Sequence, residues 1–411
     1  MNDKLNMSGV SSDEGSFVRD LRGQTGTGFQ DRTHVHKDWY AKTVSYETGL
    51  AAIESDAGQR EDILCERSDM RPSVSDSVEN YGKFCFEYKD GREFFPTEHA
   101  LEQMGTASKT STFYLRSLLK NPVNTKGEDL YPRDRFDAET LVTVCHNALR
   151  RVESDKKFRF RTYQDGTLRA WLSESYAPVD NRWFLEALQS VIPNGRLSHW
   201  RGNADTVFGN ILVPDTIIDY GQDDDSDYGA MISVGNCEIG TRRISTSPSL
   251  FRSICMNGCI WGQVKGDALN QVHRGEIDLN DLKSRISNNI ESQLSLVPAG
   301  LQRLMASRSM EITGGMKKVI AVICKENKLS KVESSEVLTQ WVSEEREHRN
   351  LFGVVNAVTR AGQKFNNASW VKFDNLGGKL LDIDDNKWSN ILNRAESTED
   401  KNVNAVFSGS V

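Results

Sequence analysis

The chain has 411 residues, which is room for about two or three domains, and its net charge of −7 excludes a protein that coats nucleic acid or a membrane with basic residues along its whole length. No apolar run approaches the roughly 20 residues of a membrane span, and the first residues lack the apolar stretch typical of a signal peptide. Seven cysteines form no CxxC pair, and their odd number is typical of reduced thiols. We therefore expect a protein that is neither secreted, nor membrane-embedded, nor held together by disulfides.

Both ends of the chain have a polar composition. Residues 1–30 consist mainly of Gly, Ser, Asp, Asn and Thr, and residues 34–75 add only a short aromatic patch at Trp39 and Tyr40. Such segments bury too little apolar surface to offset the entropy of ordering the chain. We predict a mostly disordered arm over residues 1–75 and a flexible tail over residues 396–411.

Strand and helix signals alternate from residue 76 to residue 275. Aromatic residues 83–88 and 93–95 flank Asp90-Gly91 and predict a hairpin, after which Thr97 is a candidate helix N-cap. The other elements expected here are helices at 97–104, 111–120, 137–151, 183–191 and 250–255, and strands at 157–163, 168–172, 206–213, 229–235 and 242–244. This pattern predicts an α+β core domain, with an antiparallel sheet and flanking helices, over residues 76–275.

Helical spacing dominates the rest of the chain. Apolar residues recur every three or four positions over 278–306, 316–326, 332–346 and 351–365, and no clear strand interrupts them. We predict an all-helical segment over residues 276–395, packed on the core domain.

The hairpin over residues 156–172 depends on the length of its loop, because a slip of one residue moves every side chain of a strand to the other face. A two-residue Asp165-Gly166 loop mixes charged and apolar side chains on both faces. A three-residue loop from Gln164 to Gly166 pairs Tyr163 with Thr167, and it places most charged side chains on one face and most apolar side chains on the other. One face then carries Phe158, Phe160, Thr162, Leu168, Ala170 and Leu172; the other carries Arg159, Arg161, Tyr163, Arg169 and Trp171. We predict the second arrangement.

The second face has the chemistry of a nucleic-acid site. Seven basic residues, Lys156 and Lys157 among them, stand against three acidic ones over residues 147–171. Basic groups bind phosphates and aromatic rings stack on bases, so we expect single-stranded nucleic acid to bind Arg159, Arg161, Tyr163, Arg169, Trp171, Lys156 and Lys157. The same pattern also fits an exposed face whose arginines pair with acids elsewhere, or a second packing layer in which Trp171 is buried.

Other chemistry has little support. Asp223, Asp224, Asp225 and Asp227 lack the spacing of an EF-hand and fit a solvated loop better than a metal site. There is no HExxH motif, no P-loop and no GxSxG elbow, and no pair of carboxylates stands out for acid–base catalysis. We expect no cofactor, no metal and no catalytic residue.

Four segments together resemble a known family. They are residues 98–119, 168–188, 232–262 and 351–381, with Asp180-Asn181, Asn236-Cys237-Glu238, Asn257-Gly258 and Asn356-Ala357-Val358-Thr359 as their most specific marks. They look like the uncharacterised phage/plasmid-like protein family, a domain of unknown function, although Cys237 stands where a serine is expected. The resemblance implies the cytoplasm of a bacterial host and the company of replication and recombination functions, but no catalytic residue.

These observations lead to a functional expectation. The chain is expected to be a non-enzymatic accessory protein of a mobile element that binds single-stranded DNA, in the manner of an annealing or protecting protein, and to act as a homo-oligomer. The alternative is a modulator or inhibitor that binds a host protein, which the acidic balance and the polar arm favour.

Overall fold

Aromatic strands build the first of two sheets. The computed structural model describes residues 40–57, 60–119, 135–219, 227–252, 257–259, 269–365 and 367–407. In it, β3 (Phe84–Tyr88) and β4 (Glu93–Pro96) form the expected hairpin. The other strands of this sheet are β1 (Arg60–Glu66), β2 (Met70–Val74), β5 (Lys157–Tyr163) and β6 (Thr167–Ser173). The order is β1-β5-β6-β4-β3-β2, and every pair is antiparallel except β4 with β6.

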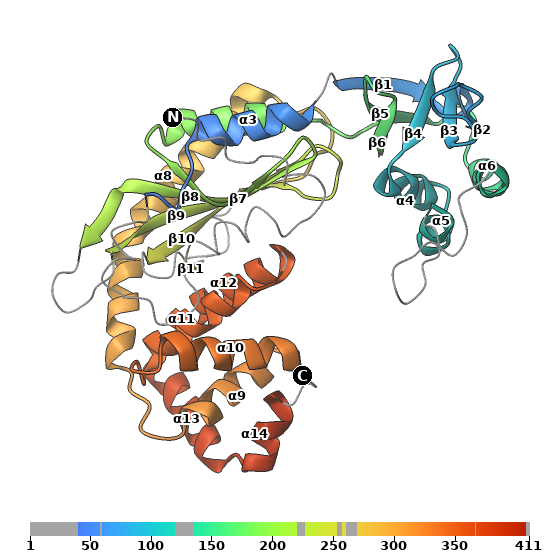
Figure 1. The fold of residues 1–411 in the computed structure, drawn as a ribbon. Coiled ribbons are helices and arrows are strands. Elements are labelled where there is room, and N and C mark those ends of the chain that lie inside the picture. Colours follow the sequence, from blue (N-terminus) through green and yellow to red (C-terminus); the bar gives the residue numbers. More distant parts are fainter. Residues whose placement is uncertain are drawn as a thin grey trace.

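Three helices accompany this sheet (Figure 1). They are α4 (Glu98–Ala107), α5 (Thr112–Leu119) and α6 (Arg135–Leu149). Thr97 caps α4 as predicted, because its hydroxyl accepts a hydrogen bond from the backbone N–H of Ala100 at 3.1 Å. The apolar core between sheet and helices is rich in aromatic rings from the strands and in small or aliphatic side chains from α4 and α6.

The second sheet has longer strands. They are β7 (Arg196–Gly202), β8 (Thr206–Asp219), β9 (Asp227–Cys237), β10 (Ile244–Arg252) and the short β11 (Asn257–Cys259), in the order β11-β10-β9-β8-β7, with β12 (Leu269–Gln271) paired to β10. One face is apolar and lies against α3 (Tyr46–Ala57), α7 (Asn181–Val191) and α8 (Leu279–Ala306) (Figure 1). Together with the first sheet this arrangement confirms the α+β class.

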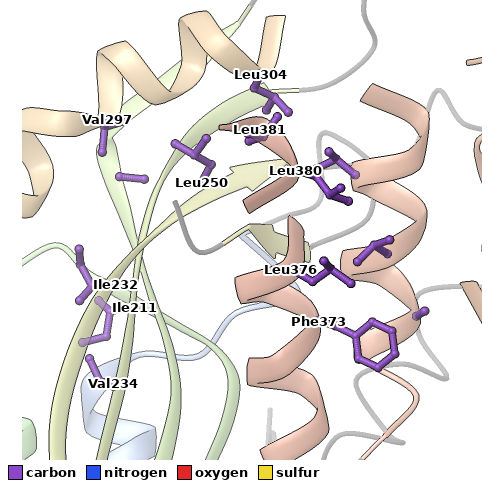
Figure 2. Close-up of a cluster of buried hydrophobic side chains, with 14 of the residues drawn as sticks. Ile211, Ile232, Val234, Leu250, Val297, Leu304, Phe373, Leu376, Leu380 and Leu381 are labelled. Carbon is purple, nitrogen blue, oxygen red and sulfur yellow. The ribbon is translucent and has the colours of Figure 1, made fainter. Parts of the chain in front are cut away.

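In the described chain from residue 279 onward the regular elements are all helices, apart from an isolated bridge between Glu311 and Asn350. After α8 come α9 (Met316–Glu326), α10 (Lys331–Glu344), α11 (Leu351–Gly362), α12 (Asn367–Leu381), α13 (Asp385–Ser397) and α14 (Asp400–Phe407). Their buried side chains and those of the second sheet form one cluster. Figure 2 shows part of it, from Ile211 and Ile232 on the strands to Leu376 and Leu380 on α12.

Several expectations are corrected. Residues 46–57 and 60–74, assigned to the arm, form α3, β1 and β2, whose few buried side chains give no clear period. Residues 250–252 are strand rather than helix, because they pair with β9, and Asn257-Gly258 lies in β11. Residues 400–407, assigned to the tail, form α14, where Val403 is buried. Residues 1–39 lie outside the described part of the chain.

Membrane insertion by a helix finds no support in the described ranges, since none of their helices is both long and apolar enough to cross a bilayer.

Candidate nucleic-acid interface

The loop of the arginine-rich hairpin has the predicted length. Thr162 pairs with Leu168, and the N–H of Gly166 donates to the carbonyl of Tyr163 at 3.0 Å. Gly166 has a φ of +83°, the left-handed conformation that the last residue of a three-residue loop requires. Gln164, Asp165 and Gly166 therefore form the loop.

A second irregularity changes the register beyond that loop. Arg161 pairs with Ala170 instead of Arg169, so Arg169 is the extra residue of a β-bulge, and Phe160 pairs with Trp171. The ring of Trp171 thus lies among aromatic side chains of the first core, 4.4 Å from Phe160 and 5.1 Å from Phe86 between centroids. It is 3% exposed. The prediction that Trp171 faces solvent is wrong.

The two arginines on the other side of the hairpin are buried as well. Arg161 donates two hydrogen bonds to Asp62, at 2.8 and 2.9 Å, and a third to Glu238 at 3.1 Å. Arg169 donates to Asp205 at 2.7 Å and to the carbonyl of Ala204 at 2.6 Å. The predicted exposure of Arg161 and Arg169 is therefore wrong, because carboxylates from distant segments already pair with them.

The remaining predicted residues lie around these two. The guanidinium of Arg169 stacks on the ring of Tyr163, 4.3 Å from its centroid. The side chain of Arg159 is 23% exposed and 4.0 Å from Asp62, and Lys156 and Lys157 are the exposed members of the predicted set. The structure thus brings Arg161, Tyr163 and Arg169 together, but as an internal contact between the two sheets.

Glu238 is the centre of that contact. Its carboxylate has no exposed surface and accepts hydrogen bonds from Arg60 at 2.5 Å, from Arg161, and from the backbone N–H of Asn181 at 2.8 Å. Arg169 lies 3.6 Å away. Asn181 begins α7, so Glu238 satisfies a free N–H of that helix, whereas the side chain of Asp180 makes no cap hydrogen bond.

The charges of this cluster are balanced. Burial lowers the pKa of Arg161, but its hydrogen bonds to Asp62 and the charges of Asp62, Glu238 and Asp180 outweigh burial, so the pKa of Arg161 is raised. A phosphate bound here would have to displace carboxylates that are already desolvated and paired, at considerable cost. The cluster therefore joins the sheets and is a poor nucleic-acid site.

A different surface has the required chemistry: the face of the second sheet that points away from α7 and α8. Its side chains fall into three rows across β7, β8, β9 and β10. The rows are Arg196, Leu212, Met231 and Ser249; then Ser198, Asn210, Ser233 and Ser247; then Arg201, Phe208, Gly235 and Ser245. We call this the polar face; Leu212 and Met231 in its first row pack on Phe251, and its partly exposed side chains are Arg196, Arg201, Ser245 and Ser247. Its middle row is held by a hydrogen bond of 2.6 Å from Ser233 to Asn210.

Arg242 lies over the third row. Its guanidinium carbon is 4.6 Å from the centroid of Phe208, and its Cδ occupies space that a Cβ on Gly235 would approach to 3.0 Å. Within the described ranges, neither a hydrogen bond nor an ion pair engages this guanidinium. Burial lowers its pKa. A half-buried cation without a counter-ion is costly, and an anion would relieve that cost.

A second arginine stacks on an aromatic ring in the first row. The guanidinium carbon of Arg196 lies 4.0 Å from the centroid of Tyr40, and Arg196 donates to the carbonyl of Thr43 at 2.8 Å. Tyr40 is largely exposed. Exposed rings and guanidinium planes are what single-strand binding proteins offer to bases and phosphates, and of these two rings Tyr40 is exposed while Phe208 is buried beneath Arg242.

The sequence analysis did not identify Arg242 as a site residue, although the sequence of the neighbouring strand indicates the polar face. In β10, Ser245, Ser247 and Ser249 alternate with Ile244, Thr246, Pro248 and Leu250, which marks a strand with one polar face. Nothing local reveals that Phe208, more than thirty residues earlier, lies under Arg242.

The other candidate sites gain no support from the described structure. No group of His, Cys, Asp or Glu in the described ranges is arranged to hold a metal, and Asp223, Asp224 and Asp225 lie outside those ranges. Asn356 is no candidate either, since its amide donates to the carbonyl of Phe352 in its own helix at 2.9 Å.

Comparison with known proteins does not extend this picture: no family model, no curated protein and no solved structure matches the chain.

Proposed function

We propose that this chain is a non-enzymatic accessory protein of a phage or plasmid that binds single-stranded DNA during replication or recombination in the cytoplasm of a bacterial host. The DNA lies against the part of the polar face where Arg242, Ser245 and Ser247 are partly exposed, since most other side chains of the three rows are buried. Arg242 holds a phosphate there, and the buried ring of Phe208 supports its guanidinium from beneath. The observation that carries the proposal is the guanidinium of Arg242, stacked on a ring and lacking a carboxylate partner in the described structure.

The composition of the polar face supports the same ligand. Ser245 and Ser247 are partly exposed, and Gly235 leaves the space in which Arg242 and the hydroxyl of Ser245 lie. Hydroxyl groups can donate to phosphate or to base edges, and they carry no charge that would repel the backbone. No acidic side chain stands in the three rows.

The test compares Arg242→Ala with Arg182→Ala. Arg182 is an exposed arginine on α7, at the opposite side of the second sheet, so its replacement removes the same charge elsewhere. Binding of a fluorescein-labelled oligo-dT is followed by anisotropy over a range of salt concentrations. Arg242→Ala should weaken binding and reduce the slope of log K against log salt by about 0.7, the value for one phosphate contact on a single strand. Arg182→Ala should behave as the unmodified protein.

Two results would end the proposal. One is an unmodified protein that does not bind oligo-dT at low salt. The other is an Arg242→Ala protein that binds with unchanged affinity and slope. Phe208→Leu separates the two parts of the site, because it keeps an apolar side chain under Arg242 but removes the ring, and it should weaken binding without changing the salt slope.

A second function, modulation of a host protein, has an observation of its own. On α5, Phe113 is 82% exposed and Tyr114 is 47% exposed, and exposed aromatic side chains are typical of protein contacts. If this function holds, the immobilised chain retains one host protein after nuclease treatment, and Phe113→Ser abolishes that retention. Retention that survives Phe113→Ser, or is lost with nuclease, counts against it.

A further inference from the structure

A cavity of about 370 Å³ lies in the all-helical segment, where α9, α12 and α13 meet. Its floor consists of buried or half-buried aliphatic side chains, and its rim of charged or amide side chains. The floor is Ile323, Leu376, Leu380, Ile383 and Ile391, and the rim is Glu326, Asn327, Lys379, Asp382 and Lys387. The cavity is far along the chain from the polar face and shares no residue with it.

The rim has a net positive charge once its ion pairs are counted. Glu326 accepts from Arg394 of α13, and Asp382 accepts from Arg303 of α8 at 2.7 Å. Both acids of the rim are thereby neutralised. The ammonium groups of Lys379 and Lys387 are exposed and make no hydrogen bond or ion pair in the described structure. The cavity thus presents an apolar floor beneath two free cations.

We propose that this cavity binds the C-terminal residue of a partner polypeptide, with a large apolar side chain on the floor and the terminal carboxylate at Lys379 and Lys387. A chain terminus is the one place in a polypeptide where a carboxylate and an apolar side chain share a Cα atom. Half of the lining is polar, as in the apolar centre and polar rim of a protein contact, whereas small-molecule sites are lined mainly by apolar groups. The volume suits one large side chain with its main chain.

The cavity also has fixed walls. Ile323, Leu376, Leu380 and Ile391 belong to the large core cluster, so three packed helices hold the floor before any ligand arrives. Preformed sites lose little entropy on binding, which allows a contact of one residue to be measurable. The partner is then any protein that ends in an apolar residue preceded by acidic ones, because Lys379 and Lys387 would attract acidic side chains and repel basic ones.

The experiment uses the full chain and a short fluorescein-labelled peptide that ends in Asp-Leu-Phe with a free carboxylate. Anisotropy should show binding to the unmodified protein and at least about fivefold weaker binding to Lys379→Glu combined with Lys387→Glu, because each exposed ion pair contributes up to about 1 kcal/mol. Lys325→Glu is the matched control. Lys325 is an exposed lysine near the end of α9 that does not line the cavity, and its replacement should leave binding unchanged.

Three outcomes would overturn the proposal. The first is that the same peptide with a C-terminal amide binds as tightly as the free acid. The second is that the double lysine variant, shown to be folded by circular dichroism, keeps full affinity. The third is that octanoate binds the cavity while the peptide does not, which would assign the cavity to a small amphipathic carboxylate. Arg242→Ala must bind the peptide normally, so a failure here is distinguishable from a failure of the DNA proposal.

Discussion

Three arginine side chains surround the buried carboxylate of Glu238, and they reach it from β1, β5 and β6 of the first sheet. Glu238→Ala would leave Arg161 and Arg169 buried with less than their full compensation. Removing one member of a buried ion cluster costs about 3–5 kcal/mol, so we expect the free energy of unfolding in urea to fall by about that amount. Glu174→Ala, an exposed acid without an ion pair in the described structure, should change it by less than about 0.5 kcal/mol. Equal losses in the two variants would refute this role.

For single residues, the sequence shows which side chains are charged or aromatic, but it does not show which groups surround them in the fold. The alternation from Lys157 to Tyr163 correctly indicates a strand with two unlike faces. What it does not contain is the position of the acids: Asp62 is 99 residues from Arg161, and Glu238 is 77 residues from it. An arginine beside tyrosine and tryptophan therefore has the same local sequence pattern whether it binds a phosphate or forms an ion pair with a carboxylate of the same chain.

The hairpin loop offers a test at the scale of an element. Gly166 combines a φ of +83° with a tight site, where an added Cβ would lie 3.0 Å from the carbonyl oxygen of Glu93. Gly91 has a similar φ of +89° and open space around it. Alanine at either position pays the left-handed backbone cost of about 1–2 kcal/mol, but only Gly166→Ala also pushes β6 away from β4. Urea unfolding should show a clearly larger loss for Gly166→Ala than for Gly91→Ala, and a loss of the same size would contradict the close contact.

Elements with a strong period are predictable, and irregularities within them are not. The spacing of apolar residues places α8 and α9 within one or two residues of their observed ends, because a long amphipathic face leaves few alternatives. The bulge at Arg169 has no comparable signal. One extra residue there carries Trp171 to the inner face, and it forms because the rings of Phe86, Phe158 and Phe160 bury that tryptophan better than solvent does.

Between the two sheets, His273 gives the whole molecule a dependence on pH. Its ring stacks on Tyr176 at 5.1 Å, and Nδ1 lies 3.1 Å from the carbonyl of Ala177. Burial lowers the pKa of His273, and the charge of Arg161 lowers it further, against the opposing effect of the Ala177 carbonyl. The folded protein thus binds this proton less readily than the unfolded chain. The contribution of neutral His273 to the free energy of unfolding is therefore fully present above the unfolded pKa of about 6.5, and it is lost as the pH falls below that value.

Urea midpoints at about pH 7.5 and about pH 5.5 measure this effect. The unmodified protein should be less stable at the lower pH, and His273→Gln should show a smaller difference, because glutamine does not titrate. A difference that is unchanged in His273→Gln would assign the loss to other groups.

The strand order of the first sheet also has a consequence for synthesis on the ribosome. β1 and β4 are made early, yet each pairs with a strand of the β5–β6 hairpin, which lies between them in the sheet and is made much later. Until residues 157–173 leave the exit tunnel, both early strands present unpaired edges, and such edges invite contact with other nascent chains. The first sheet therefore cannot complete its fold in the order in which it is translated, and a chaperone that covers these edges during that interval would prevent such contacts.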